Sequence, residues 1–122
     1  MSRGAVAVVS LADVDPIELP QGSWTRMLVT AARVDANESS LGYSVFTPGT
    51  ELTPVRHETE EVAYVVAGSG ELRLDAETIA FREGDALHIP ANTWHAVANT
   101  GDSDVVMVFG FPHPEYPPTE RR

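Results

Sequence analysis

The sequence has no cysteine, no long apolar run and no segment with a long helical pattern. The absence of cysteine excludes disulfides, cysteine-ligated zinc sites and thiol nucleophiles. No apolar run approaches the ~18 residues of a membrane-spanning helix, so we expect no transmembrane segment. The N-terminal stretch MSRGAVAVVSLADVD holds one Arg and a short apolar run that soon turns acidic, which does not favour a signal peptide. We therefore expect a cytoplasmic protein.

Basic residues are also scarce. The chain carries 8 Lys and Arg against 18 Asp and Glu, which gives a formal net charge of −10 at pH 7. DNA, RNA and anionic membranes bind basic surfaces, so this balance argues against all three as partners. The 122 residues, of which 43% are apolar, are enough for one domain with one core. We expect that domain to span residues 1–122.

The sequence does contain many short apolar segments separated by turn residues. Leu72 and Leu74, for example, alternate with charged residues as in a half-buried strand. Turns are predicted at Pro48-Gly49 and at Gly68-Ser69-Gly70, and such signals at intervals of ~8–12 residues indicate an all-β sandwich or barrel. The predicted strands are residues 5–9, 23–30, 40–47, 52–57, 62–66, 71–75, 78–81, 86–89, 94–98 and 105–111, with a loop over residues 11–21.

The chain ends in a proline-rich tail that begins at about residue 112. Its sequence, PHPEYPPTERR, holds four prolines, which exclude a helix and an inner strand because proline lacks a backbone N–H. Two arrangements remain open for the tail: it lies along the domain, or it is loose.

Three potential metal ligands stand at two places in the sequence. His57 and Glu61 lie four residues apart, at the end of one apolar run and the start of the next, and His95 follows in a later run. Two imidazoles and one carboxylate are the ligand set of a two-His-one-carboxylate metal site. Each residue also has a simpler interpretation: the histidines are hydrogen-bonded strand residues, and Glu61 is a solvated charge beside Glu58 and Glu60.

The spacing around these residues resembles the two signature motifs of the cupin superfamily, in particular its small single-domain (cupin 2-like) members. The first motif is Gly, five residues, His-x-His, three or four residues, Glu, six residues and Gly, and it is matched by Gly49, His57, Glu61 and Gly68. The second is Gly, five residues, Pro-x-Gly, two residues, His, three residues and Asn, and it is matched by Gly84, Pro90, His95 and Asn99.

This resemblance implies an antiparallel β-barrel or jelly roll with a divalent metal inside it. It assigns His57, Glu61 and His95 as the metal ligands. Fe(II) is the favoured metal, and Mn, Ni and Zn remain open. Such proteins are often dimeric, and the apolar residues 5–9 could add to the sheet edge of a second copy, so we expect a homodimer.

Two positions depart from the motifs. Val55 replaces the first histidine and cannot bind metal, so the remaining three ligands would leave about three coordination positions open. Strand residues two apart share a face, so Val55 and His57 are expected inside the barrel and Arg56 outside, in a surface ion pair. Asn92 replaces a glycine, and Asn tolerates the left-handed backbone expected there.

These residues predict a metal-dependent enzyme that acts on a small organic molecule by oxygenase-type chemistry at a site of two histidines and one glutamate. One alternative is an isomerase, cyclase or lyase. Another, supported by Val55, is a non-catalytic or degenerate cupin that binds a small ligand such as a sugar or an aromatic acid. His88 is either a strand side chain packed by aromatic residues or a catalytic acid/base or substitute ligand in the pocket.

Overall fold

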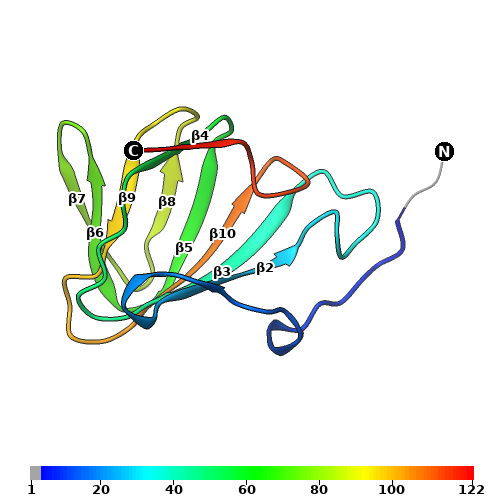
Figure 1. Ribbon diagram of the computed structural model, residues 1–122, viewed down its shortest axis with the longest axis horizontal. Coiled ribbons are helices and arrows are strands. Elements are labelled where there is room, and N and C mark those ends of the chain that lie inside the picture. Colours follow the sequence, from blue (N-terminus) through cyan, green and yellow to red (C-terminus); the bar gives the residue numbers. More distant parts are fainter. Residues whose placement is uncertain (1–3) are drawn as a thin grey trace.

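The computed structural model describes residues 4–122 as two antiparallel β-sheets that face each other (Figure 1). The six-stranded sheet has the order β1 (Ile17–Glu18), β2 (Trp24–Val29), β3 (Ser40–Phe46), β10 (Val105–Phe111), β5 (Glu61–Ala67) and β8 (Ala86–Ile89). The five-stranded sheet has the order β11 (Thr119–Arg121), β4 (Val55–His57), β9 (His95–Ala98), β6 (Ser69–Leu74) and β7 (Thr78–Arg82). This all-β jelly roll confirms the predicted fold class.

Helical structure is confined to two short 3-10 turns, η1 (Leu11–Asp13) and η2 (Pro20–Gly22), in the residues that the structure describes. η1 lies in the predicted loop over residues 11–21, which also contains the two-residue strand β1, and η2 ends one residue beyond that loop. Within residues 4–122 there is no helix long and apolar enough to span a membrane.

The strands alternate between an inner and an outer face. Along β5, Ala63 and Val65 are buried while Val62 and Tyr64 are each 50% exposed. Because side chains of a strand alternate with a period of two, Glu61 shares the inner face with Ala63 and Val65. The first residue of β5 is therefore a carboxylate that points between the sheets.

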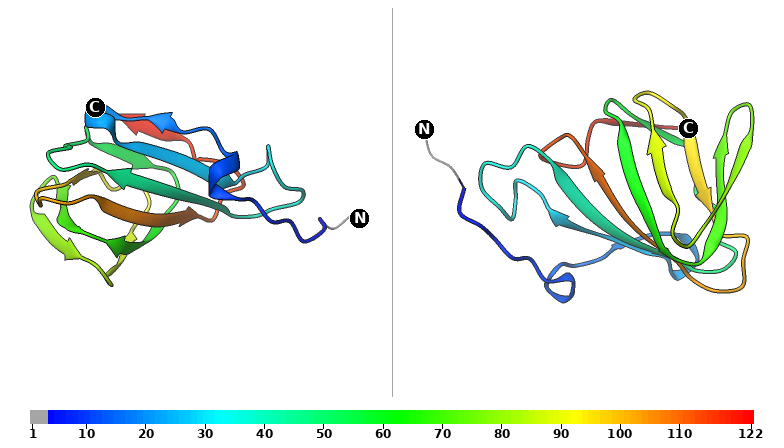
Figure 2. Two further views of the ribbon diagram at one scale, coloured as in Figure 1. Left: turned by 90° about the horizontal axis from the view of Figure 1, so that it is seen from below. Right: turned by 180° about the vertical axis from the view of Figure 1, so that it is seen from behind.

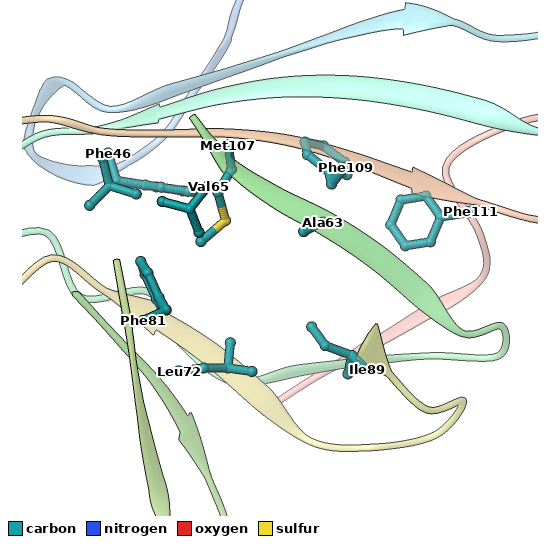
Figure 3. Packing of buried hydrophobic residues seen from close by; sticks show 10 residues of the cluster. Phe46, Ala63, Val65, Leu72, Phe81, Ile89, Met107, Phe109 and Phe111 are labelled. Atoms are coloured by element: carbon teal, nitrogen blue, oxygen red, sulfur yellow. The ribbon is translucent and has the colours of Figure 1, made fainter. Parts of the chain in front are cut away.

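Apolar side chains from both sheets meet in the space between them and form the core (Figure 3). The six-stranded sheet contributes Phe46, Ala63, Val65, Ile89, Val105, Met107, Phe109 and Phe111, and the five-stranded sheet contributes Leu72 and Phe81. Burial of large apolar side chains contributes about 1.5–3 kcal/mol each, so this layer is the main source of stability.

The connection between β5 and β6 consists of Gly68 alone, which carries the chain from one sheet to the other. Gly68 has a φ of 85°, and a Cβ there would lie 2.3 Å from the carbonyl oxygen of Asp104. Only glycine fits such a crossing. The predicted three-residue turn is therefore wrong for Ser69 and Gly70, which already belong to β6.

The predicted strand over residues 5–9 is not formed. These residues run outside the two sheets (Figure 2), and the side chains of Val6 and Val8 are 99% and 91% exposed. A strand needs a neighbouring strand for its backbone hydrogen bonds, and the described part of this chain offers none at that place. The predicted strand 52–57 is also shorter, since β4 begins only after Pro54, which has no N–H to donate.

The proline-rich tail lies along the barrel and ends as an edge strand. In β11, Thr119 pairs with His57 and Arg121 pairs with Val55 of β4. The last residue, Arg122, forms an ion pair with Asp75 at 2.6 Å and stacks over the ring of Trp94 at 4.2 Å. These contacts hold the tail against the five-stranded sheet, so of the two arrangements considered the structure has the ordered one.

Candidate metal centre

Strand pairing and one bend bring His57, Glu61 and His95 together. β4 lies beside β9, with Val55 opposite His95, so His57 and His95 come from neighbouring strands of one sheet. The residues after His57 bend the chain into the opposite sheet, where Glu61 begins β5. The two histidines are 4% and 5% exposed. The Oε1 of Glu61 lies 3.2 Å from the Nε2 of His57 and 3.4 Å from the Nε2 of His95.

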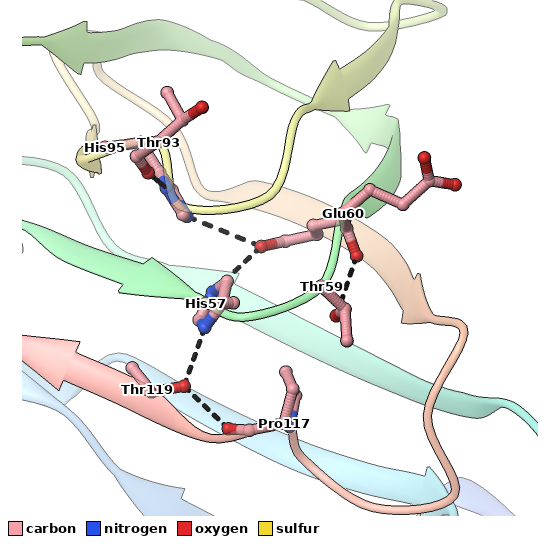
Figure 4. Close-up of polar contacts among 8 residues, drawn as sticks. His57, Thr59, Glu60, Thr93, His95, Pro117 and Thr119 are labelled. Atoms are coloured by element: carbon pink, nitrogen blue, oxygen red, sulfur yellow. Dashed lines mark hydrogen bonds and ion pairs between the residues drawn. The ribbon is translucent and has the colours of Figure 1, made fainter.

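A hydrogen-bonded chain behind His57 determines which ring nitrogen carries its proton (Figure 4). The Oγ1 of Thr119 donates to the carbonyl oxygen of Pro117 at 2.7 Å, so its single proton is used. The same oxygen lies 2.7 Å from the Nδ1 of His57 and must accept a hydrogen bond from it. The Nε2 of neutral His57 therefore presents a lone pair toward Glu61.

His95 is oriented in the same way by a backbone carbonyl. Its Nδ1 lies 2.8 Å from the carbonyl oxygen of Thr93, which can only accept a hydrogen bond. The Nδ1 of His95 therefore carries the proton, and the Nε2 of the neutral ring presents its lone pair toward Glu61. Outer hydrogen bonds of this kind are typical of histidines that bind metal through the opposite nitrogen.

The consequence is a group of three electron-pair donors with no proton between them. The candidate ligand atoms of His57, Glu61 and His95 all lie within 4.8 Å of one another. At metal–ligand bonds of ~2.1 Å, two ligand atoms lie ~3.0 Å apart at a right angle and ~3.4 Å apart at a tetrahedral angle. The observed 3.2 and 3.4 Å separations suit ligands to a shared cation, so the residues present fit a divalent metal ion.

The electrostatics of the group also favour a cation at its centre. Burial raises the pKa of the Glu61 carboxyl, but its contacts with His57 and His95 outweigh burial, so the pKa lies below its ordinary value. Burial lowers the pKa of His95, but the Glu61 carboxylate and the Thr93 carbonyl outweigh burial and raise the pKa. A proton on the Nε2 of His95 and a metal ion would therefore compete for the same place beside Glu61.

Aromatic rings hold the imidazole of His57 in place. The ring lies edge-to-face with Phe111 at 5.0 Å, with His95 at 5.1 Å and with Tyr116 at 5.3 Å between ring centroids. Such packing restricts ring rotation and fixes the direction of Nε2. Tyr116 comes from the tail, so the tail contributes directly to the surroundings of the site.

The three residues open into a cavity of about 470 Å³ between the sheets. Its walls are mostly apolar, and its size suits a small organic molecule. The apolar lining includes Leu19, Met27, Phe46, Leu52, Val55, Ala63, Leu72, Leu87, Ile89, Val97, Met107, Phe109 and Phe111.

The structure confirms the predicted orientations in β4. Val55 and His57 line the cavity, whereas Arg56 points outward and pairs with Glu120 at 2.9 Å. Asn92 has a φ of 60°, as expected for a residue in the glycine position of the motif, and its N–H donates to the carbonyl oxygen of His57 at 2.7 Å. Asn92 thus holds the end of β4 in place.

The structure does not bring His88 to the site. Its side chain is 59% exposed, and its Nε2 lies 3.2 Å from the Oε1 of Glu60, which is 52% exposed. In β8 the buried neighbour is Ile89, and His88 occupies the opposite, outer face. The side chain is also not packed by aromatic residues in the way that the simpler interpretation predicts, because it is largely open to solvent.

Sequence reasoning missed the contribution of the tail, which supplies Tyr116, Thr119 and Arg121 to the site and its cavity. The available signal was weak. Thr119 and Arg121 have the two-residue spacing of a strand, but β11 has three residues and follows two prolines. A strand this short cannot be recognised without knowledge of its partner.

Comparison with known proteins places this site in a family context. The polyketide synthase CurC of Streptomyces cyaneus is 34% identical over 110 residues, which cover 89% of this chain and 71% of CurC. The 5-nitrosalicylic acid 1,2-dioxygenase of Bradyrhizobium sp is 35% identical over 66 residues, which cover 54% of this chain and 32% of that protein.

Among solved structures, the polyketide cyclase RemF from Streptomyces resistomycificus superposes with a TM-score of 0.80 at 23% identity, over 96% of this chain and 85% of that one. This likeness shows a shared fold. The family model described as "Cupin domain" matches residues 42–111, a range that contains both predicted motifs. The chain therefore belongs to the cupin family, as the motif spacing predicts.

Proposed function

We propose that the protein is a metal-dependent enzyme that closes a ring in a small polyketide-type molecule. The observation that carries the proposal is the convergence of two Nε2 lone pairs and the ionised Glu61 carboxylate at the wall of an apolar cavity. A divalent ion held by His57, Glu61 and His95 would supply Lewis-acid polarisation of a substrate oxygen. In ring closure of this type, the carbon beside one carbonyl loses a proton and bonds to the carbon of another carbonyl, whose oxygen takes up a proton, so the step needs no oxidant.

The cavity supports a substrate with an apolar carbon skeleton. Phe46, Met107 and Phe109 line it, so water is displaced from the region beside the candidate ligands when a molecule fills it. These walls would hold a flexible chain in a folded form, which brings its reacting carbons together. CurC, a relative similar over most of this chain, is named a polyketide synthase, and this name supports the same class of substrate.

A second candidate is an oxygenase that uses Fe(II). Its support is Val55, which leaves the first-histidine position without a ligand, and the dioxygenase relative that matches about half of the chain. The two candidates differ in their need for O₂ and for a redox-active metal. Turnover in the absence of O₂ with Zn²⁺ in the site supports the cyclase, and turnover that requires both Fe(II) and O₂ supports the oxygenase.

We further propose that the protein is a homodimer. The outer face of the six-stranded sheet exposes Val62, Tyr64 and Val66 of β5, the last at 42%, together with Leu41 at 38%. The unpaired residues 5–9 extend from the same chain with their backbone free to pair. A second copy would cover both features, because an apolar sheet face and an unpaired extended segment are both typical of interfaces.

The first prediction concerns metal content. Purified wild-type protein reconstituted with a divalent metal and passed over a desalting column should retain about one ion per chain. Replacement of His57 or His95 by Ala should reduce retention at least tenfold, because loss of one of three ligands removes a large share of the affinity. The measurement is elemental analysis by mass spectrometry.

His88→Ala is the matched control, since it removes an exposed imidazole on the outer face and should leave the metal content unchanged. Wild-type protein that never retains stoichiometric metal contradicts the proposal and leaves the non-catalytic ligand-binding cupin as the better interpretation.

The second prediction concerns pH. In metal-free protein the lowered pKa of Glu61 contributes stability above its ordinary value of 4.5, and this is lost as pH falls through the folded-state pKa. The raised pKa of His95 contributes stability below its ordinary value of 6.5, and this is lost as pH rises through the folded-state pKa. Their joint contribution is therefore largest between pH 4.5 and 6.5.

A metal ion requires the histidines to be deprotonated, so the stabilisation that it provides should grow as pH rises above 6.5. Thermal melting with EDTA and with saturating Zn²⁺, measured at about pH 5.5 and about pH 8, compares the two states. The melting temperature should increase more on metal addition at the higher pH, and Glu61→Gln should remove most of this difference. Equal increases at both pH values would contradict this account of the site.

The third prediction concerns the oligomeric state. Size-exclusion chromatography with light scattering should give about twice the chain mass of 13.2 kDa at micromolar concentration. Tyr64→Lys should shift the protein to monomers, because it buries a charge in the proposed interface. Ala80→Lys is the control, since Ala80 is exposed on the outer face of the other sheet. A wild-type monomer, or a dimer broken by Ala80→Lys alone, contradicts the proposed interface.

A further inference from the structure

The tail strand β11 brings Arg121 to the cavity lining and Thr119 to the ring of His57. Thr119 pairs with His57, and Arg121 pairs with Val55. Paired residues on neighbouring strands point to the same side of a sheet, and both Val55 and His57 face the cavity. Arg121 therefore points the same way and is part of the cavity lining.

Arg121 lies next to Val55, the residue that replaces the first histidine of the cupin motif. β4 lies between β9 and β11, so Val55 has His95 as its partner on one side and Arg121 on the other. The Val55 side chain has no hydrogen-bonding group. A polar group of a bound molecule that lies over Val55 would therefore find its partners on the two flanking strands.

Arg121 brings a positive charge that the cavity does not neutralise. It is the only Arg or Lys among the described residues that line the cavity, and within residues 4–122 no carboxylate forms an ion pair with it. Two other arginines of β4 and the tail do have carboxylate partners. Arg56 pairs with Glu120 and Arg122 pairs with Asp75, both on the outside. In a chain of net charge −10, this cation is available for a ligand.

The acidic groups of the cavity are already engaged. Glu61 contacts both histidines, and Glu51 pairs with Arg73 at 2.5 Å. Neither one is paired with Arg121. The cavity lining thus contains a carboxylate, Glu61, that is engaged with the two histidines, and a guanidinium, Arg121, that has no carboxylate partner among the described residues.

Tyr116 adds a hydrogen-bond donor beside Arg121. Its ring packs against His57 and Phe111, and it lines the same cavity. The phenolic O–H of Tyr116 is a hydrogen-bond donor in the cavity lining.

We propose that Arg121 and Tyr116 bind an anionic group of the substrate, while the apolar walls hold its carbon skeleton. The substrate class is thus an apolar organic acid, with a carboxylate at the tail end of the cavity. A guanidinium suits this role because its parallel N–H groups match the two oxygens of a carboxylate. This inference adds the substrate class to the proposed function and rests on it in one respect, namely that the cavity binds the substrate.

The test is calorimetric titration of the metal-loaded protein with two probes, salicylate and salicylamide, which share a flat ring and differ in charge. Wild-type protein should prefer salicylate. Arg121→Gln should weaken salicylate binding about 10- to 100-fold, the effect of losing a charged hydrogen-bond partner, while salicylamide binding changes little. Tyr116→Phe should weaken salicylate binding about three- to tenfold.

Two further variants separate recognition from general effects. Arg121→Lys keeps the charge and should restore part of the preference, although it loses the paired N–H geometry. Arg82→Gln removes the same charge from the end of β7, outside the cavity, and should bind both probes as the wild type does. Melting temperatures close to that of the wild type confirm that each variant is folded.

The proposal is overturned if wild-type protein does not prefer salicylate, or if Arg121→Gln keeps the wild-type preference. Metal content measured on the same samples tests the proposed function separately. A protein that holds no metal but loses its preference in Arg121→Gln contradicts the metal site and supports the anion site. A protein that holds metal and still prefers salicylate in the Arg121→Gln variant supports the metal site and contradicts the anion site.

Discussion

The hydrogen bonds behind the two imidazoles are the interactions on which this site depends. The Thr93 carbonyl and the Thr119 hydroxyl each accept from an Nδ1–H, and this leaves both Nε2 lone pairs directed at Glu61. A buried carboxylate between two lone pairs is unfavourable unless a positive charge lies among them. The hydrogen bonds at the two Nδ1 atoms therefore make the site favour a cation. This preference for a cation follows from the local geometry alone.

One of these hydrogen bonds depends on the last residues of the chain. Thr119 reaches His57 because β11 pairs with β4, and β11 is held by the ion pair and ring stacking of Arg122. The same strand carries Arg121, and the turn before it carries Tyr116. The tail therefore has three roles in one short segment. It orients His57, it adds the edge strand of one sheet, and it supplies Arg121 and Tyr116 to the cavity lining.

The part of the site that can be predicted from sequence is the part encoded by local spacing. Motif register predicts that His57, Glu61 and His95 meet, and the two-residue period of a strand puts Val55 inside and Arg56 outside. The role of Asn92 follows from backbone conformation alone. These inferences need only the spacing along the chain and the geometry of one strand or turn.

What cannot be predicted depends on pairing between distant segments. Arg121 enters the cavity because it is opposite Val55, and nothing near residue 121 in the sequence reveals that register. Residues 5–9 have the composition of a strand, but the described chain offers them no partner. His88 is a candidate acid/base or substitute ligand in the sequence, yet the alternation of side chains along β8 turns it to the outer face with Glu60.

The most direct test of the account is a crystal structure of the metal-reconstituted protein with anomalous diffraction data at the absorption edge of the metal. The account predicts one anomalous peak within bonding distance of the Nε2 of His57, the Nε2 of His95 and a carboxylate oxygen of Glu61. Absence of a peak at that point in fully reconstituted protein, or a peak held by other residues, would contradict it.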